Sequence, residues 1–126
     1  MKNLIIKSFS LISIIILISV NTRAAEVLSA TYINDKKSVS IKVERWGGCI
    51  SVHEYELEYK DCSATIPAQC EAKLVDLTKA KDECDYIINE TIIVPIKSKY
   101  VDNSSYKNAL FTIKGDYHSS VTFKLP

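Results

Sequence analysis

Residues 53–59 read HEYELEY, and their pattern predicts a β-strand. Apolar or aromatic side chains alternate with glutamates, and a period of two residues is typical of a strand with one face in the core and the other in water. Glu54, Glu56 and Glu58 therefore share the solvated face. His53 is in phase with the opposite face, so we expect it to point into the core or its rim.

The same alternation recurs along the chain beyond residue 24. It predicts about seven short strands with turn-forming residues at intervals of roughly 8–12 residues. We therefore predict an all-β fold: a small antiparallel β-sandwich of immunoglobulin-like shape, with a barrel as the alternative. Helical periodicity is confined to a short turn around Leu77–Asp82. The alternating apolar residues are Leu28, Ala30 and Tyr32; Val39, Ile41 and Val43; Cys70, Ala72 and Leu74; Ile92, Val94 and Ile96; Ala109, Phe111 and Ile113; Val121, Phe123 and Leu125.

The first 24 residues have the three parts of a signal peptide. Lys2 and Lys7 precede an apolar run over residues 11–20, and small residues stand before a cut after Ala24. A membrane-spanning helix needs about 20 apolar residues, and this run is about half that length. We predict a signal peptide over residues 1–24, one exported domain over residues 25–126, and no membrane span after cleavage. The predicted localisation is periplasmic or secreted.

Cleavage changes the charge balance of the chain. It removes three basic residues and leaves 13 basic against 15 acidic side chains. The remaining lysines are scattered, so the domain lacks the basic patch that nucleic-acid binding requires. We therefore expect no nucleic-acid partner.

Four cysteines remain in the predicted exported domain: Cys49, Cys62, Cys70 and Cys84. An even count in an oxidising compartment predicts two disulfides. The alternative is a metal site, because Cys49 and His53 have a plausible ligand spacing, but the chain lacks the close cysteine pairs of zinc sites. Loop-closure entropy favours the nested and the sequential pairings equally, at about 6 kcal/mol each. It therefore leaves the connectivity open.

A sequence pattern across residues 47–85 bears on the connectivity of the disulfides. Gly48-Cys49-x-x-x-His53-x-Tyr55-x-Leu57, then Pro67-x-Gln69, then Asp82-x-Cys84, resembles small uncharacterised secreted or lipoprotein-type bacterial β domains. In that pattern the first and last cysteines occur without the middle two. The resemblance implies a disulfide between Cys49 and Cys84, with a second disulfide between Cys62 and Cys70 across a loop. It implies no activity, and this chain lacks a lipid-attachment cysteine.

Two groups of residues have side chains that could carry chemistry. His53 suits a general base or metal ligand, but the cysteines are assigned to disulfides and no Gly-x-Ser-x-Gly or His-Glu-x-x-His motif is present. We interpret it as a structural histidine bonded to a backbone carbonyl. The row Glu54, Glu56 and Glu58 has a spacing compatible with acid–base hydrolysis or calcium binding. We interpret it as a solvated face or a contact for a basic partner.

Aromatic residues suggest a surface for recognition. Tyr100, Tyr106 and Tyr117 lie in polar surroundings, where tyrosine suits a ligand or protein contact. Trp46 precedes two glycines, and we expect it to pack in the core beside a disulfide. His118 is expected in a hairpin turn.

These observations favour an exported, non-enzymatic β domain that binds another protein or a cell-envelope glycan, or serves the envelope structurally. We predict no catalytic residues, no metal site and no cofactor. The alternative is a secreted or periplasmic inhibitor of a hydrolase such as lysozyme, because an acidic face suits a basic enzyme.

Overall fold

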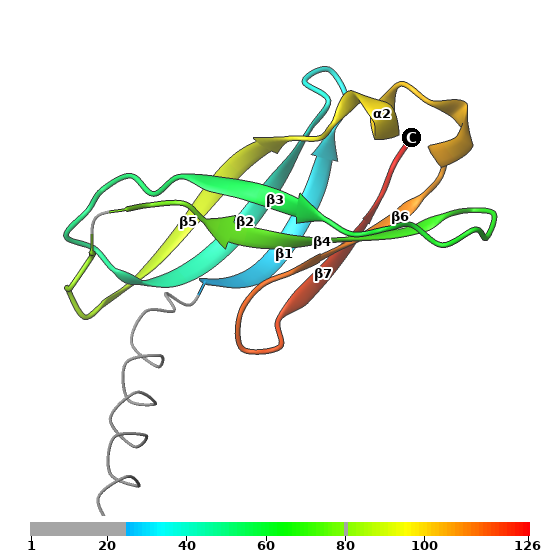
Figure 1. Cartoon of the computed structure of the whole chain (residues 1–126). Coiled ribbons are helices and arrows are strands. Elements are labelled where there is room, and N and C mark those ends of the chain that lie inside the picture. Colours follow the sequence, from blue (N-terminus) through cyan, green and yellow to red (C-terminus); the bar gives the residue numbers. More distant parts are fainter. Residues whose placement is uncertain (1–24, 80) are drawn as a thin grey trace, which may run out of the picture.

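A computed structural model describes residues 25–79 and 81–126 (Figure 1). The predicted signal peptide, residues 1–24, lies outside the described residues. In the described part of the chain, no helix has the length and hydropathy of a membrane span. The elements are β1 (Ala25–Ile33), β2 (Ser38–Gly47), β3 (Tyr55–Tyr59), β4 (Gln69–Asp76), β5 (Tyr86–Pro95), α2 (Ser98–Val101), η3 (Ser104–Tyr106), β6 (Leu110–Lys114) and β7 (Ser120–Lys124).

The strands form two sheets without barrel closure, so the predicted sandwich is confirmed. One sheet has the order β1-β2-β5 and the other β3-β4-β6-β7. The pairing is antiparallel except between β4 and β6, which run parallel. The first sheet has the order of strands A, B and E in the immunoglobulin fold. The second differs, because β4 lies between β3 and β6.

The core fills the space between the sheets. The inward row of β2, Val39, Ile41 and Val43, is fully buried, and Phe111 and Ile113 of β6 face it from the other sheet. Each such side chain contributes roughly 1.5–3 kcal/mol through burial. The period of two in the sequence therefore predicts the buried rows of β2 and β6 correctly. Figure 1 shows the strands crossing as two layers, with α2 beside the C-terminus.

Two local expectations differ from the structure. The sequence predicts Leu28 in phase with Ala30 and Tyr32, but a register shift between Val27 and Ser29 turns it to the exposed outer face. The helical turn expected around Leu77–Asp82 is wrong for the described residues of that stretch, which lie in a loop. The short helices instead follow β5.

Both disulfides of the nested pairing are present. Cys49 joins Cys84, and Cys62 joins Cys70 across eight residues. The first bridge ties the loop after β2 to the loop before β5. The second closes the loop between β3 and β4. The pairing that the resemblance implied is therefore confirmed.

Candidate functional site

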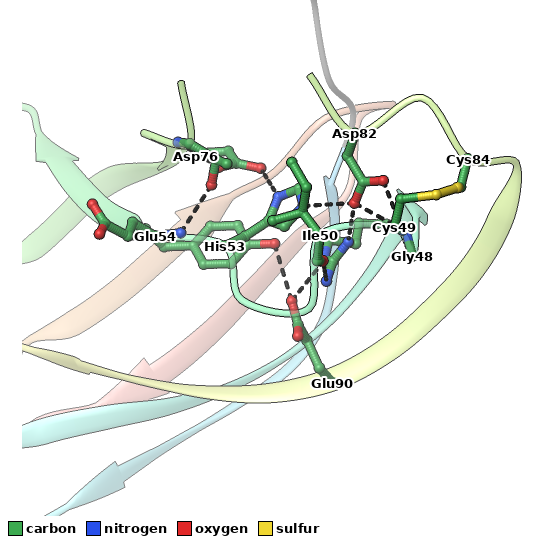
Figure 2. Close-up of polar contacts among 12 residues, drawn as sticks. Gly48, Cys49, Ile50, His53, Glu54, Asp76, Asp82, Cys84 and Glu90 are labelled. Carbon is green, nitrogen blue, oxygen red and sulfur yellow. Dashed lines mark hydrogen bonds and ion pairs between the residues drawn. A yellow bond between two sulfur atoms is a disulfide. The ribbon is translucent and has the colours of Figure 1, made fainter. Parts of the chain in front are cut away.

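A buried polar network includes His53, which lies in the loop two residues before β3. Its side chain is 1% exposed, and both ring nitrogens face carboxylates. Nδ1 lies 2.6 Å from Asp76 Oδ2, and Nε2 lies 2.9 Å from Asp82 Oδ2 (Figure 2). The expected backbone carbonyl partner is therefore wrong, and two aspartates take its place. A histidine ring can donate to both carboxylates only as the imidazolium.

Asp82 is the hub of this network. It accepts hydrogen bonds from the backbone N–H groups of Gly48, at 3.0 Å, and Cys49, at 2.9 Å, as well as from His53. Burial of this carboxyl opposes its ionisation, but His53 and the backbone N–H groups outweigh that effect and hold the pKa of Asp82 well below its usual range. Gly47 makes the approach possible, because its φ is +141° and a Cβ there would overlap the Asp82 carboxylate.

Arg45 links this hub to β5. It carries the last inward side chain of β2, and its guanidinium contacts Asp82 Oδ2 at 3.3 Å and Glu90 Oε1 at 2.8 Å. The hydroxyl of Tyr55 donates to the same Glu90 oxygen at 3.2 Å. Burial, with the nearby negative charge of Glu90, raises the pKa of Tyr55 well above its usual value. The network therefore runs from Asp76 through His53, Asp82 and Arg45 to Glu90.

The geometry of this network fits a structural role. Each buried side-chain nitrogen or oxygen among the described residues has a hydrogen-bond partner, and fully satisfied networks of this kind rigidify a core. Cys49 and Cys84 lie with Asp82 in a group of metal-ligand type. Their sulfurs are joined to each other, and the thiolate is the form that binds metal. This group therefore fits the disulfide and not a metal ion.

The glutamate row has the orientation expected of it. Glu54, just before β3, and Glu56 and Glu58 within it are all exposed. Glu56 and Glu58 lie on an edge strand of the second sheet. On the neighbouring strand β4, Lys73 lies directly opposite Glu58, so a basic side chain borders this row.

The three tyrosines do not form one surface. Tyr100 is only 4% exposed and packs against Tyr59, Tyr106 and Phe111, with ring centroids 5.1–5.2 Å away. The predicted contact role is therefore wrong for Tyr100, because it fills the core beneath α2. Tyr106 is half-buried against it. Tyr117 is exposed in the turn between β6 and β7, at the far end of β6, where His118 also lies as expected.

An exposed apolar group, not predicted from the sequence, lies on the outer face of the β1-β2-β5 sheet. Trp46, expected in the core, is 53% exposed and lies directly opposite Ile87, which is 52% exposed. A shallow depression beside them is lined by Leu28 together with polar residues of β2 and β5: Lys42, Glu44, Asn89 and Thr91. Parity could have located Trp46, because it is out of phase with the buried row of β2.

Neither a protein-family model nor a curated protein nor a solved structure matches this chain.

Proposed function

We propose that this chain is an exported, non-catalytic domain that binds a partner protein through the outer face of the β1-β2-β5 sheet. The observation that carries the proposal is the exposed pair formed by Trp46 and Ile87. Tryptophan is enriched among the residues that dominate protein interfaces. An exposed apolar pair bordered by polar side chains has the composition of an interface centre and rim.

The buried network supports the non-catalytic part of this proposal. A general base must reach the proton that it abstracts, directly or through one water. Both nitrogens of His53 are already engaged by Asp76 and Asp82, and its side chain is almost fully buried. The same contacts explain the residue as a structural tie between two loops. The two disulfides fit the oxidising compartment that export would provide.

The test is capture of partners from the native exported fraction. The bait is the oxidised protein, compared with Trp46→Ser and with Ile66→Ser as a matched control. Ile66 is an exposed apolar residue in the loop between β3 and β4. We expect one protein to be retained by the wild type and by Ile66→Ser and lost with Trp46→Ser. Equal retention by all three baits would refute the role of this face.

A cell-envelope glycan is the other ligand that an exposed tryptophan beside polar groups would suit. Sedimentation with insoluble cell-wall material separates the two ligand classes. If the protein binds that material and the binding depends on Trp46, the ligand is a glycan and not a partner protein. Turnover of a peptide or cell-wall substrate that is lost with His53→Ala would overturn the non-catalytic role.

The exposed row Glu54, Glu56 and Glu58 supports a second candidate, an inhibitor of a basic hydrolase such as lysozyme. Complementary charge accelerates association and fixes the register of such complexes. The expected result is loss of lysozyme activity at a one-to-one ratio, weakened when the three glutamates are changed to glutamine. Trp46→Ser serves as the control, because it leaves this charge intact. Full lysozyme activity at excess protein would eliminate this candidate.

A further inference from the structure

The free edge of β5 is unusually open for pairing. β5 is ten residues long, and within the described chain β2 is its only strand neighbour. Natural edge strands are usually short, charged or bulged, which prevents association with another strand. β3, an edge of the other sheet, is five residues long and carries glutamates. β5 has a single charged residue, Glu90, and that side chain is directed inward to Arg45.

The sequence of β5 reads alike in both directions. Residues 87–93 are IINETII, with two isoleucines and one uncharged polar residue on each side of Glu90. An antiparallel pair of two copies with its two-fold axis at Glu90 would set Ile87 opposite Ile93 and Asn89 opposite Thr91. Each opposed pair has the same parity, so it lies on one face of the combined sheet. A two-fold interface requires this self-complementarity.

We propose that β5 pairs in this register with β5 of a second copy, joining two three-stranded sheets into one six-stranded sheet. The existing β2–β5 register supports the pairing. Trp46 lies opposite Ile87 within one chain, and Ile87 would lie opposite Ile93 of the second copy. These three side chains would form one exposed apolar row across the joined sheets. Two such rows form, one on each side of the axis. Strand addition supplies backbone hydrogen bonds, and the apolar rows supply specificity.

The inner face accommodates the meeting of the two Glu90 residues. Like charges directly opposite each other destabilise a strand pair. Each Glu90 carboxylate, however, accepts bonds from its own Arg45 Nε, at 2.8 Å, and its own Tyr55 hydroxyl, at 3.2 Å. The cation of each chain thus lies beside the charge that would otherwise oppose pairing. The dimer does not depend on the proposed binding role, although it would present two copies of the Trp46 face on one sheet.

The test uses charges placed at the opposed positions 89 and 91, which are exposed on the outer face. Sedimentation equilibrium of the oxidised wild-type protein is expected to show a reversible dimer. Asn89→Lys/Thr91→Lys sets lysine against lysine on both sides of the axis. Asn89→Lys/Thr91→Glu changes the same positions but sets lysine against glutamate. We expect the dissociation constant of the first variant to exceed that of the second by about tenfold or more.

A mixture gives the sharpest result. Asn89→Lys/Thr91→Lys and Asn89→Glu/Thr91→Glu should each be monomeric alone and should form a heterodimer together. Circular dichroism checks that all variants fold. A wild-type protein that stays monomeric at millimolar concentration would overturn the proposal. So would a dimer that survives unchanged in both like-charge variants, since it would use another surface.

Discussion

At the scale of single residues, Arg45 is the cation on which the buried anions depend. Its side chain is almost fully buried between Asp82 and Glu90. Arg45→Met keeps much of the side-chain volume and removes the charge, leaving two carboxylates without their shared cation. We expect the free energy of unfolding to fall by about 3–5 kcal/mol, the usual cost of breaking a buried ion pair.

Lys42→Met is the matched control for this prediction. Lys42 lies on the same strand but on its exposed face, so the change should stay within about 0.5 kcal/mol. Urea unfolding of the two variants measures the difference. Equal losses would show that Arg45 does not hold the network together.

The two aspartates that bond His53 make stability depend on pH. Burial opposes ionisation of Asp76, but its bonds with Thr78 and His53 prevail and lower its pKa, as the contacts of Asp82 do for that residue. The unfolded chain therefore takes up protons first as pH falls. Stability should be complete above the ordinary aspartate value, near pH 4, and should be lost progressively below it.

Urea midpoints measured from neutral pH downward check this prediction. Asp82→Asn should weaken the fall of the urea midpoint at acid pH, called here the acid limb. It should also lower stability at neutral pH. Asp35→Asn, in the exposed turn between β1 and β2, should leave the limb unchanged. An acid limb that is the same in Asp82→Asn would show that Asp82 is not its source.

The buried network also shows what parity predicts about single residues. Val39, Ile41 and Val43 place Arg45 on the inward face, so its burial was predictable from the sequence. Its partners were not, because Asp82 lies in a loop and Glu90 on β5, and their approach depends on the tertiary fold. His53 was predicted to point inward, which is confirmed, but its two carboxylate partners required the structure.

At the scale of elements, local alternation located the strands but not their exact faces or neighbours. It missed the bulge at Leu28, because a one-residue register shift depends on β2 and not on β1 alone. It also began β5 too late, since an edge strand with both faces partly exposed shows weak alternation in residues 86–91. The parallel pairing of β4 with β6 is a property of the topology and is not encoded in either strand.

The two disulfides should contribute unequally to stability. The loop closed by Cys49 and Cys84 spans 35 residues, and that closed by Cys62 and Cys70 spans eight. Loop-closure entropy predicts about 3.8 kcal/mol for the first bridge and about 2.5 kcal/mol for the second. Replacing each pair of cysteines with serine should therefore destabilise the domain in that order. Loss of the first bridge also frees the loop whose Cys49 backbone N–H donates to Asp82, so we expect that contact to loosen as well.

Urea unfolding without reductant measures the free energy of unfolding of both serine variants. Peptide mass mapping under non-reducing conditions confirms that the remaining disulfide has formed. The reverse order of stability would contradict the entropic argument.

At the scale of the whole molecule, the two sheets are joined where β1 begins. The backbone nitrogen of Ala25 lies 3.0 Å from Asp116 Oδ2, and Asp116 donates its own N–H to the Ala25 carbonyl. The turn between β6 and β7 thus clamps the start of β1. Val27 is held to the same turn by the Ser119 hydroxyl.

Cleavage after Ala24, as the sequence predicts, would convert the nitrogen of Ala25 from an amide into an ammonium group facing the Asp116 carboxylate. A bond with both partners charged is stronger than the amide bond that it replaces. In protein whose intact mass shows that it begins at Ala25, Asp116→Asn should lower the free energy of unfolding by about 1 kcal/mol. Acetylation of the Ala25 nitrogen removes the charge, so the same substitution should then cost less. Equal losses in the free and acetylated forms would show that the new ammonium does not contribute, and a mass that includes residues 1–24 would contradict the cleavage itself.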